Sequence, residues 1–101
     1  MNRSLRGNDT FALQNELRKQ FEGNQIQFVL TELDTAATFC DVAASAFDAE
    51  KTKRNIANAR TAYDTALKFA RNANFDEHTK IQFDTKRSRV EVLLTALGEH
   101  I

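Results

Sequence analysis

The sequence predicts an all-α fold, an up-down antiparallel bundle of three long helices with a shorter helix at the N-terminal end. Composition gives the first indication, because the 101 residues include 3 Gly and no Pro, the two residues that most often interrupt helices and form turns. Residues that favour helix (Ala, Leu, Lys, Arg, Glu and Gln) are plentiful. Apolar residues also recur every three or four positions, as they do along one face of a helix.

The chain length fits one domain. We assign residues 9–101 to a single helical-bundle domain and the polar residues 1–8 to a flexible N-terminus. The predicted helices cover residues 9–22, 25–46, 50–72 and 75–97. Gly23 lies between the first two, and one Gly inside a helix costs only about 1 kcal/mol relative to Ala. Residues 9–22 therefore either form a separate helix or continue the second helix through Gly23.

Local signals mark the ends of the later helices. Asp48 is a candidate N-cap for residues 50–72, because an Asp side chain accepts a hydrogen bond from a free backbone N–H in the first turn. Asn74 and Glu77 have the spacing of a capping box, which predicts the start of the last helix there. Gly98 predicts the C-terminal stop of that helix.

The helix of residues 25–46 carries two apolar faces. Leu30, Leu33 and Cys40 are on one face, whereas Phe28 and Phe39 fall on nearly the opposite face. A surface helix normally has one apolar stripe, so we expect this helix to be covered on both sides by other helices or by a second subunit.

Charge is balanced overall, with 14 basic and 14 acidic residues, but it is unevenly placed. Residues 23–50 contain five acids and no base, whereas residues 51–71 contain six bases and one acid. A short connection makes these segments neighbours, which predicts charge complementarity across a helical hairpin. Arg60 and Lys68 are expected on the solvent side of this hairpin. The overall neutrality argues against a dedicated nucleic-acid-binding protein.

Residues 58–67, NARTAYDTAL, place small residues around one aromatic side chain, with Ala59, Tyr63 and Ala66 separated by four and three positions. This stretch resembles the second helix of a tetratricopeptide repeat, and the resemblance implies a helical hairpin that binds a peptide or protein. The family repeats with a period of 34 residues, and no second copy of the pattern follows here. Packing of small residues against a neighbouring helix explains the same pattern.

The candidates for chemistry have simpler structural explanations. His78, at the start of the last helix, is a candidate phosphate acceptor or an ordinary exposed residue, and Cys40 is expected in the core. The basic run from Lys86 to Arg89 is expected to be a solvated helix face. No ligand set for zinc or for a di-iron centre is present, so we predict no metal, no cofactor and no catalytic residues. The longest apolar stretch falls well short of about 18 residues, which argues against a membrane-spanning helix.

We therefore expect a cytoplasmic, non-catalytic helical interaction module that pairs with its own copy as a homodimer or binds an unidentified protein partner. The alternatives are a peptide-binding tetratricopeptide-like hairpin and a phosphotransfer bundle that uses His78. The candidate interface consists of Leu17, Phe21, Phe28 and Phe39, which share one stripe if the helix continues through Gly23.

Overall fold

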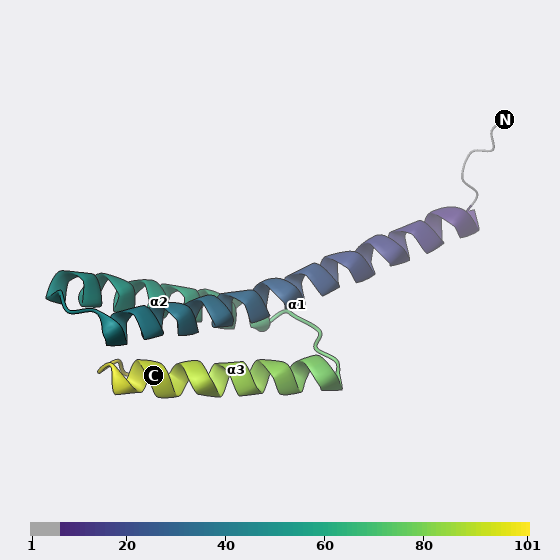
Figure 1. The fold of residues 1–101 in the computed structure, drawn as a ribbon. Helices are drawn as coiled ribbons and strands as arrows, with labels where there is room; N and C mark the ends of the chain where they lie inside the picture. The colour runs from purple at the N-terminus through teal and green to yellow at the C-terminus, as the bar shows by residue number, and fades with distance from the viewer. Residues whose placement is uncertain (1–6) are drawn as a thin grey trace.

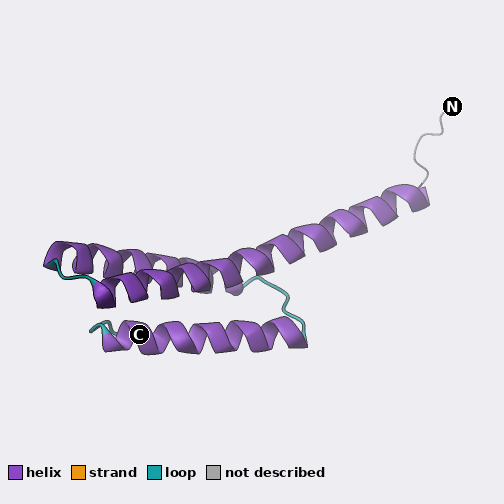
Figure 2. Ribbon diagram, viewed as in Figure 1, coloured by secondary structure: helices purple, strands orange, loops and turns teal. Residues whose placement is uncertain are grey.

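The computed structural model describes residues 7–101, with side chains from Ala12 onwards. Three helices make up this part of the chain: α1 spans Gly7–Ser45, α2 spans Ala49–Ala70 and α3 spans Glu77–Ala96 (Figure 1). Figure 2 shows helices and connecting loops in the described residues, without a strand. The predicted all-α class is confirmed.

A separate, shorter N-terminal helix is not confirmed. Residues 9–22 belong to α1, which continues without a break through Gly23. Apart from its chain neighbours and the backbone of its own helix turn, a methyl group at Gly23 would meet no atom within 4 Å, so neither a turn nor a close contact requires glycine there. The small helix penalty of one glycine is outweighed by the helix-forming residues on both sides. The predicted flexible segment, residues 1–8, lies mostly outside the described residues, and Gly7 and Asn8 belong to α1.

The helices form an elongated molecule, 67 Å × 27 Å × 16 Å. In Figure 1, α2 runs back beside the C-terminal half of α1, and α3 lies along the same half of the molecule. The N-terminal part of α1 projects beyond both. α1 has 39 residues and is about 58 Å long, whereas α2 has 22 residues and is about 33 Å long. Since α1 contacts both other helices, its C-terminal half is covered on two sides.

The core lies where the three helices meet. Its fully buried side chains include Val29 and Leu33 of α1, Ala66 of α2, and Val90 and Leu94 of α3. Cys40 also belongs to this cluster, as the sequence predicts. Small residues on the facing surfaces of α1 and α2 allow these two helices to approach closely. The core begins only at residue 29, so it anchors the second half of α1 and leaves the first half outside.

Two of the predicted helix ends are confirmed and one is wrong. Asp48 caps α2 by accepting a hydrogen bond from the backbone N–H of Glu50 at 3.0 Å, and Gly98 follows α3 with a φ of 97°. The capping box of α3 is formed by Asp76 and Thr79, and not by Asn74 and Glu77. The Asp76 carboxylate accepts from the Thr79 backbone N–H at 2.8 Å, and the Thr79 hydroxyl accepts from the Asp76 backbone N–H at 3.1 Å.

The expected charge pairing between residues 23–50 and residues 51–71 is also wrong. Among the described residues, the ion pairs that α1 forms with another helix lead to α3: Lys86 Nζ lies 2.6 Å from Asp34 Oδ1, and Arg89 Nη2 lies 3.8 Å from Asp41 Oδ2. Asp34 and Asp41 are seven residues apart, or two turns, and therefore share one face of α1. That face looks towards α3. The basic run in α3 is consequently engaged in ion pairs and is not simply solvated.

Candidate interaction surface

The first half of α1 is a helix with almost no cover from the rest of the chain. We define the α1 extension as residues 7–21, because Glu22 is the first residue with a hydrogen bond to another element, accepting from Asn74 Nδ2 at 3.2 Å. From Ala12 to Phe21 every side chain is exposed except the half-buried Asn15. Three of them are large and apolar: Leu13 is 48% exposed, Leu17 55% and Phe21 67%.

Apolar exposure continues from the extension onto the bundle. Phe28 of α1 is 41% exposed, and Phe69 of α2 is 40% exposed. Their rings pack edge to face, with centroids 5.2 Å apart and planes at 79°. We call Leu13, Leu17, Phe21, Phe28 and Phe69 together the apolar surface. It runs along one side of α1 because positions 13, 17, 21 and 28 recur at nearly whole numbers of helical turns.

A hollow of about 350 Å³ lies within the apolar surface, lined by Phe21, Asn24, Gln25, Phe28 and Phe69. Four of these residues belong to two successive turns of α1, and the fifth comes from the C-terminal end of α2. The walls are mainly aromatic, so the hollow suits an apolar side chain better than a charged group.

Three of the four predicted interface residues belong to the apolar surface. Leu17, Phe21 and Phe28 are exposed, as expected for a helix that continues through Gly23. Phe39 does not share this surface, because it is half-buried and packs against the core. At Phe39 α1 is already inside the bundle. Sequence reasoning missed Phe69, which pattern analysis of one helix cannot connect with residues of another.

The margins of the apolar surface carry amide side chains. Gln14 and Gln25 lie on one flank of the stripe, and Gln20 and Gln27 lie on the other. The charged residues of the same segment, Glu16, Arg18, Lys19 and Glu22, point further from its centre. A glutamine amide both donates and accepts hydrogen bonds, so these flanks can pair with identical side chains without like-charge repulsion.

The residues behind the tetratricopeptide resemblance occupy the inner face of α2. Ala59 and Ala66 are fully buried, and Tyr63 is 2% exposed. Tyr63 Oη donates a hydrogen bond to Glu91 Oε2 at 2.5 Å, and Arg87 Nε donates to the same oxygen at 2.9 Å. These two hydrogen bonds, that from Tyr63 first, lower the pKa of Glu91, while burial and the bond to Glu91 raise the pKa of Tyr63. This network connects α2 to α3.

A second polar connection fixes the C-terminal residues. Arg60 is not simply exposed to solvent as expected, since its guanidinium binds Asp64 within α2 and also reaches the chain end. Its Nη1 donates to Glu99 Oε1 at 3.2 Å and to the carbonyl oxygen of His100 at 2.7 Å. The hydrogen bond to Asp64 is the first cause of a raised pKa for Arg60. One side chain of α2 thereby holds the segment that follows α3.

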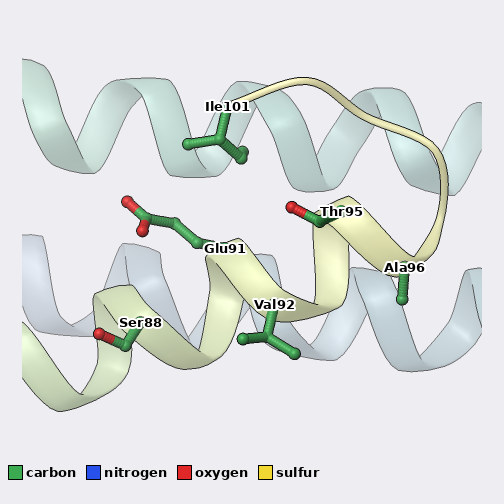
Figure 3. A pocket seen from close by; sticks show the side chains of 6 residues that line it. All are labelled: Ser88, Glu91, Val92, Thr95, Ala96 and Ile101. Atoms are coloured by element: carbon green, nitrogen blue, oxygen red, sulfur yellow. The ribbon is translucent and has the colours of Figure 1, made fainter.

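The held C-terminus borders an open hollow of about 560 Å³ on α3. Figure 3 shows Ile101 across from Glu91 and Thr95, with Ser88, Val92 and Ala96 completing the lining. Glu91 is the ionisable side chain in this lining, and it is already bonded to Tyr63 and Arg87. This hollow therefore gives no support to a catalytic or ligand-binding role, and the apolar surface is the stronger candidate for a functional site.

Among the described residues, those considered for phosphate transfer, thiol chemistry and metal binding show no arrangement that favours these roles. His78 is exposed in the first turn of α3. Cys40 is 1% exposed, and burial, followed by the nearby Asp41, raises the pKa of its thiol, which disfavours the reactive thiolate. Within the part of the chain that the structure describes, no three His, Cys, Asp or Glu side chains are grouped so that they could hold a metal ion.

None of the helices within residues 7–101 is long and apolar enough to cross a membrane. Comparison with protein-family models, with curated proteins and with solved structures finds no match to this chain.

Proposed function

We propose that this protein is a non-catalytic helical interaction module that associates with its own copy through the apolar surface. The observation that carries the proposal is the α1 extension, whose large apolar side chains Leu13, Leu17 and Phe21 are 48–67% exposed within one chain. An isolated helix of about 15 residues is marginal in water, because helices in proteins are stabilised mainly by packing of an apolar face. A partner that covers Leu13, Leu17 and Phe21 supplies that packing.

The size of the apolar surface supports a specific interface. From their exposed fractions, its five side chains present roughly 400–500 Å² of apolar area. This lies within the range of about 300–600 Å² for the largest apolar patch on a typical monomer, and such patches are often functional. A stable protein interface buries about 800 Å² on each partner. The apolar side chains with the glutamines on their flanks provide an area of that order.

A second copy of the chain is the partner that the surface fits best. A two-fold interface places the same residues on both sides, so the surface must be complementary to itself. Apolar side chains meet this condition. The flanking amides meet it as well, since each can donate to and accept from its counterpart. A partner of strongly acidic or basic character would find no opposite charge along these flanks.

Sedimentation equilibrium tests the proposal. The wild-type protein at tens of micromolar should have a mass above the 11.5 kDa of one chain. The double variant Leu17→Glu with Phe21→Glu should be a folded monomer, because both side chains lie outside the core. The matched control, Ala12→Glu with Asn15→Glu, adds the same charge to the opposite face of the α1 extension and should still associate.

Far-UV circular dichroism of each variant verifies that the bundle remains folded. A wild-type monomer throughout this concentration range contradicts the proposal. Equal dissociation of the control and of the test variant would also contradict it, since added charge alone would then explain the effect.

A further inference from the structure

The four α1 residues that line the hollow in the apolar surface have the spacing of a coiled-coil hole. Phe21, Asn24, Gln25 and Phe28 stand at positions i, i+3, i+4 and i+7. Four residues with this spacing form the hole that receives one side chain, the knob, when two helices pack as a coiled coil. Phe69 of α2 adds a further wall to this hole. The hole is thus already formed in a single chain.

We propose that two copies pair as antiparallel helices about a two-fold axis close to Gln20 and Phe21, so that Leu17 of each copy occupies the hole of the other. The inference rests on the proposed self-association and adds to it the direction, the register and the contacting residues. By symmetry the interface contains two such holes and two leucine knobs.

The choice of Leu17 follows from the spacing of the other apolar side chains. In antiparallel helices each step towards the N-terminus of one copy is a step towards the C-terminus of the other. With Leu17 in the hole, Leu13 of the same copy comes beside Phe28 and Phe69 of its partner, and the two Phe21 side chains meet near the axis. This register covers all five residues of the apolar surface. Leu13 in the hole would instead place Phe28 and Phe69 against residues that precede Leu13.

The shape of the molecule favours the antiparallel direction. Packed helices lie about 8–10 Å apart. In a parallel pair the two bundles, each part of a molecule 27 Å × 16 Å in cross-section, would compete for space at the same end of the paired helices. In the antiparallel pair the two bundles lie at opposite ends of the paired helices, so they do not compete for the same space.

Chemical cross-linking of single-cysteine variants tests the direction and the register. Gln20→Cys places a thiol on the flank next to the proposed axis, whereas Gln14→Cys places it about 20 Å from its counterpart along the helices. Lys19→Cys, on the opposite face of α1, is the matched control. A short bis-maleimide is the probe. The wild-type protein, whose thiol belongs to Cys40 and is 1% exposed, measures any cross-linking through the native cysteine.

We expect Gln20→Cys to yield a cross-linked dimer at least tenfold more efficiently than Gln14→Cys or Lys19→Cys. Efficient cross-linking of Gln14→Cys in a protein that sediments as a dimer would overturn the antiparallel register and leave self-association intact. Sedimentation of every variant as a monomer, with no cross-linking, would overturn both. Circular dichroism of each variant confirms that these exposed substitutions leave the fold unchanged.

Discussion

The hydrogen bond between Tyr63 and Glu91 allows a quantitative test of how α2 is held to α3. Tyr63→Phe removes the hydroxyl and leaves the buried ring in place. In the wild type this hydroxyl donates to Glu91 Oε2 at 2.5 Å, and Arg87 donates to the same oxygen at 2.9 Å. The variant therefore isolates one charge-assisted hydrogen bond from the packing of the aromatic ring.

The expected loss follows from the surroundings of the carboxylate. A hydrogen bond to a charged group contributes about 1.5–3 kcal/mol to stability. The Glu91 side chain is 30% exposed, so water and Arg87 partly replace the lost hydroxyl. We expect Tyr63→Phe to lower the free energy of unfolding by about 1–2 kcal/mol. Thr61→Ala, which removes an exposed hydroxyl from the same helix, should change it by less than about 0.5 kcal/mol.

The effect should depend on pH with a defined sign. The hydrogen bond from Tyr63 is the first cause of the lowered pKa of Glu91, followed by the bond from Arg87. A carboxylate whose pKa is lower in the folded state adds stability above its ordinary pKa of 4.5, and this stability is lost as the pH falls through the folded pKa. The difference between wild type and Tyr63→Phe should therefore be largest at neutral pH and shrink in acid.

Urea unfolding followed by far-UV circular dichroism measures both quantities. All proteins are compared at one concentration, because the stability of a self-associating protein depends on concentration. A loss indistinguishable from that of Thr61→Ala at neutral pH would refute the role of the hydroxyl. A difference that grows as the pH falls below 4.5 would refute the proposed stabilisation of the ionised carboxylate.

Three further substitutions test separate features of the fold. Arg60→Ala should lower the free energy of unfolding by about 1 kcal/mol or less, because exposed ion pairs are weak. It should also speed the removal of C-terminal residues by carboxypeptidase, because Arg60 binds Glu99 and His100; Arg54→Ala should leave the rate of removal unchanged. Asp76→Ala should lower the melting temperature more than Asn74→Ala does, since Asp76 is the observed cap of α3. A larger effect of Asn74→Ala would instead favour Asn74, the cap predicted from the sequence. Gly23→Ala should increase helix content and stabilise α1 by up to about 1 kcal/mol, whereas destabilisation would mean that the chain needs a break there.

Helical periodicity predicted the inner face of α2 correctly. Ala59, Tyr63 and Ala66 are all buried, because one continuous apolar stripe on a helix is a local signal that tertiary contacts reinforce. The cap of α3 shows where local signals become ambiguous. Asn74 and Asp76 are both good N-cap residues, and the choice between them depends on where the chain enters the helix. Packing of Phe75 against Phe83, with ring centroids 4.9 Å apart, helps to fix that entry point.

The charge pattern shows a different limit. Counting charges along the chain assigned the acids of α1 to the bases of α2, but a count contains no information on direction around the helix. The seven-residue spacing of Asp34 and Asp41 and the three-residue spacing of Lys86 and Arg89 place each pair on one helix face. Comparing these faces would have indicated the observed α1–α3 pairing.

The candidate surface was predictable as far as it lies on one helix. The periodic spacing of Leu17, Phe21 and Phe28 identified the stripe on condition that α1 continues through Gly23. Phe39 follows the same period, but whether its side chain is exposed depends on where α2 and α3 lie, and helical periodicity contains no information on that. Phe69 joins the surface through contact between helices. The hollow that these residues form is accordingly a property of the folded chain only.

Hydrogen–deuterium exchange at several protein concentrations shows whether a second copy covers the α1 extension. Amides of residues 12–21 have no tertiary cover within one chain, so they should exchange fast in the monomer. If a second copy covers the extension, their exchange should slow markedly as concentration rises through the range of association, while the amides of residues 29–43 in the core remain protected throughout. Fast exchange of the extension at every concentration, in protein whose core is protected, would contradict the claim that a second copy covers it.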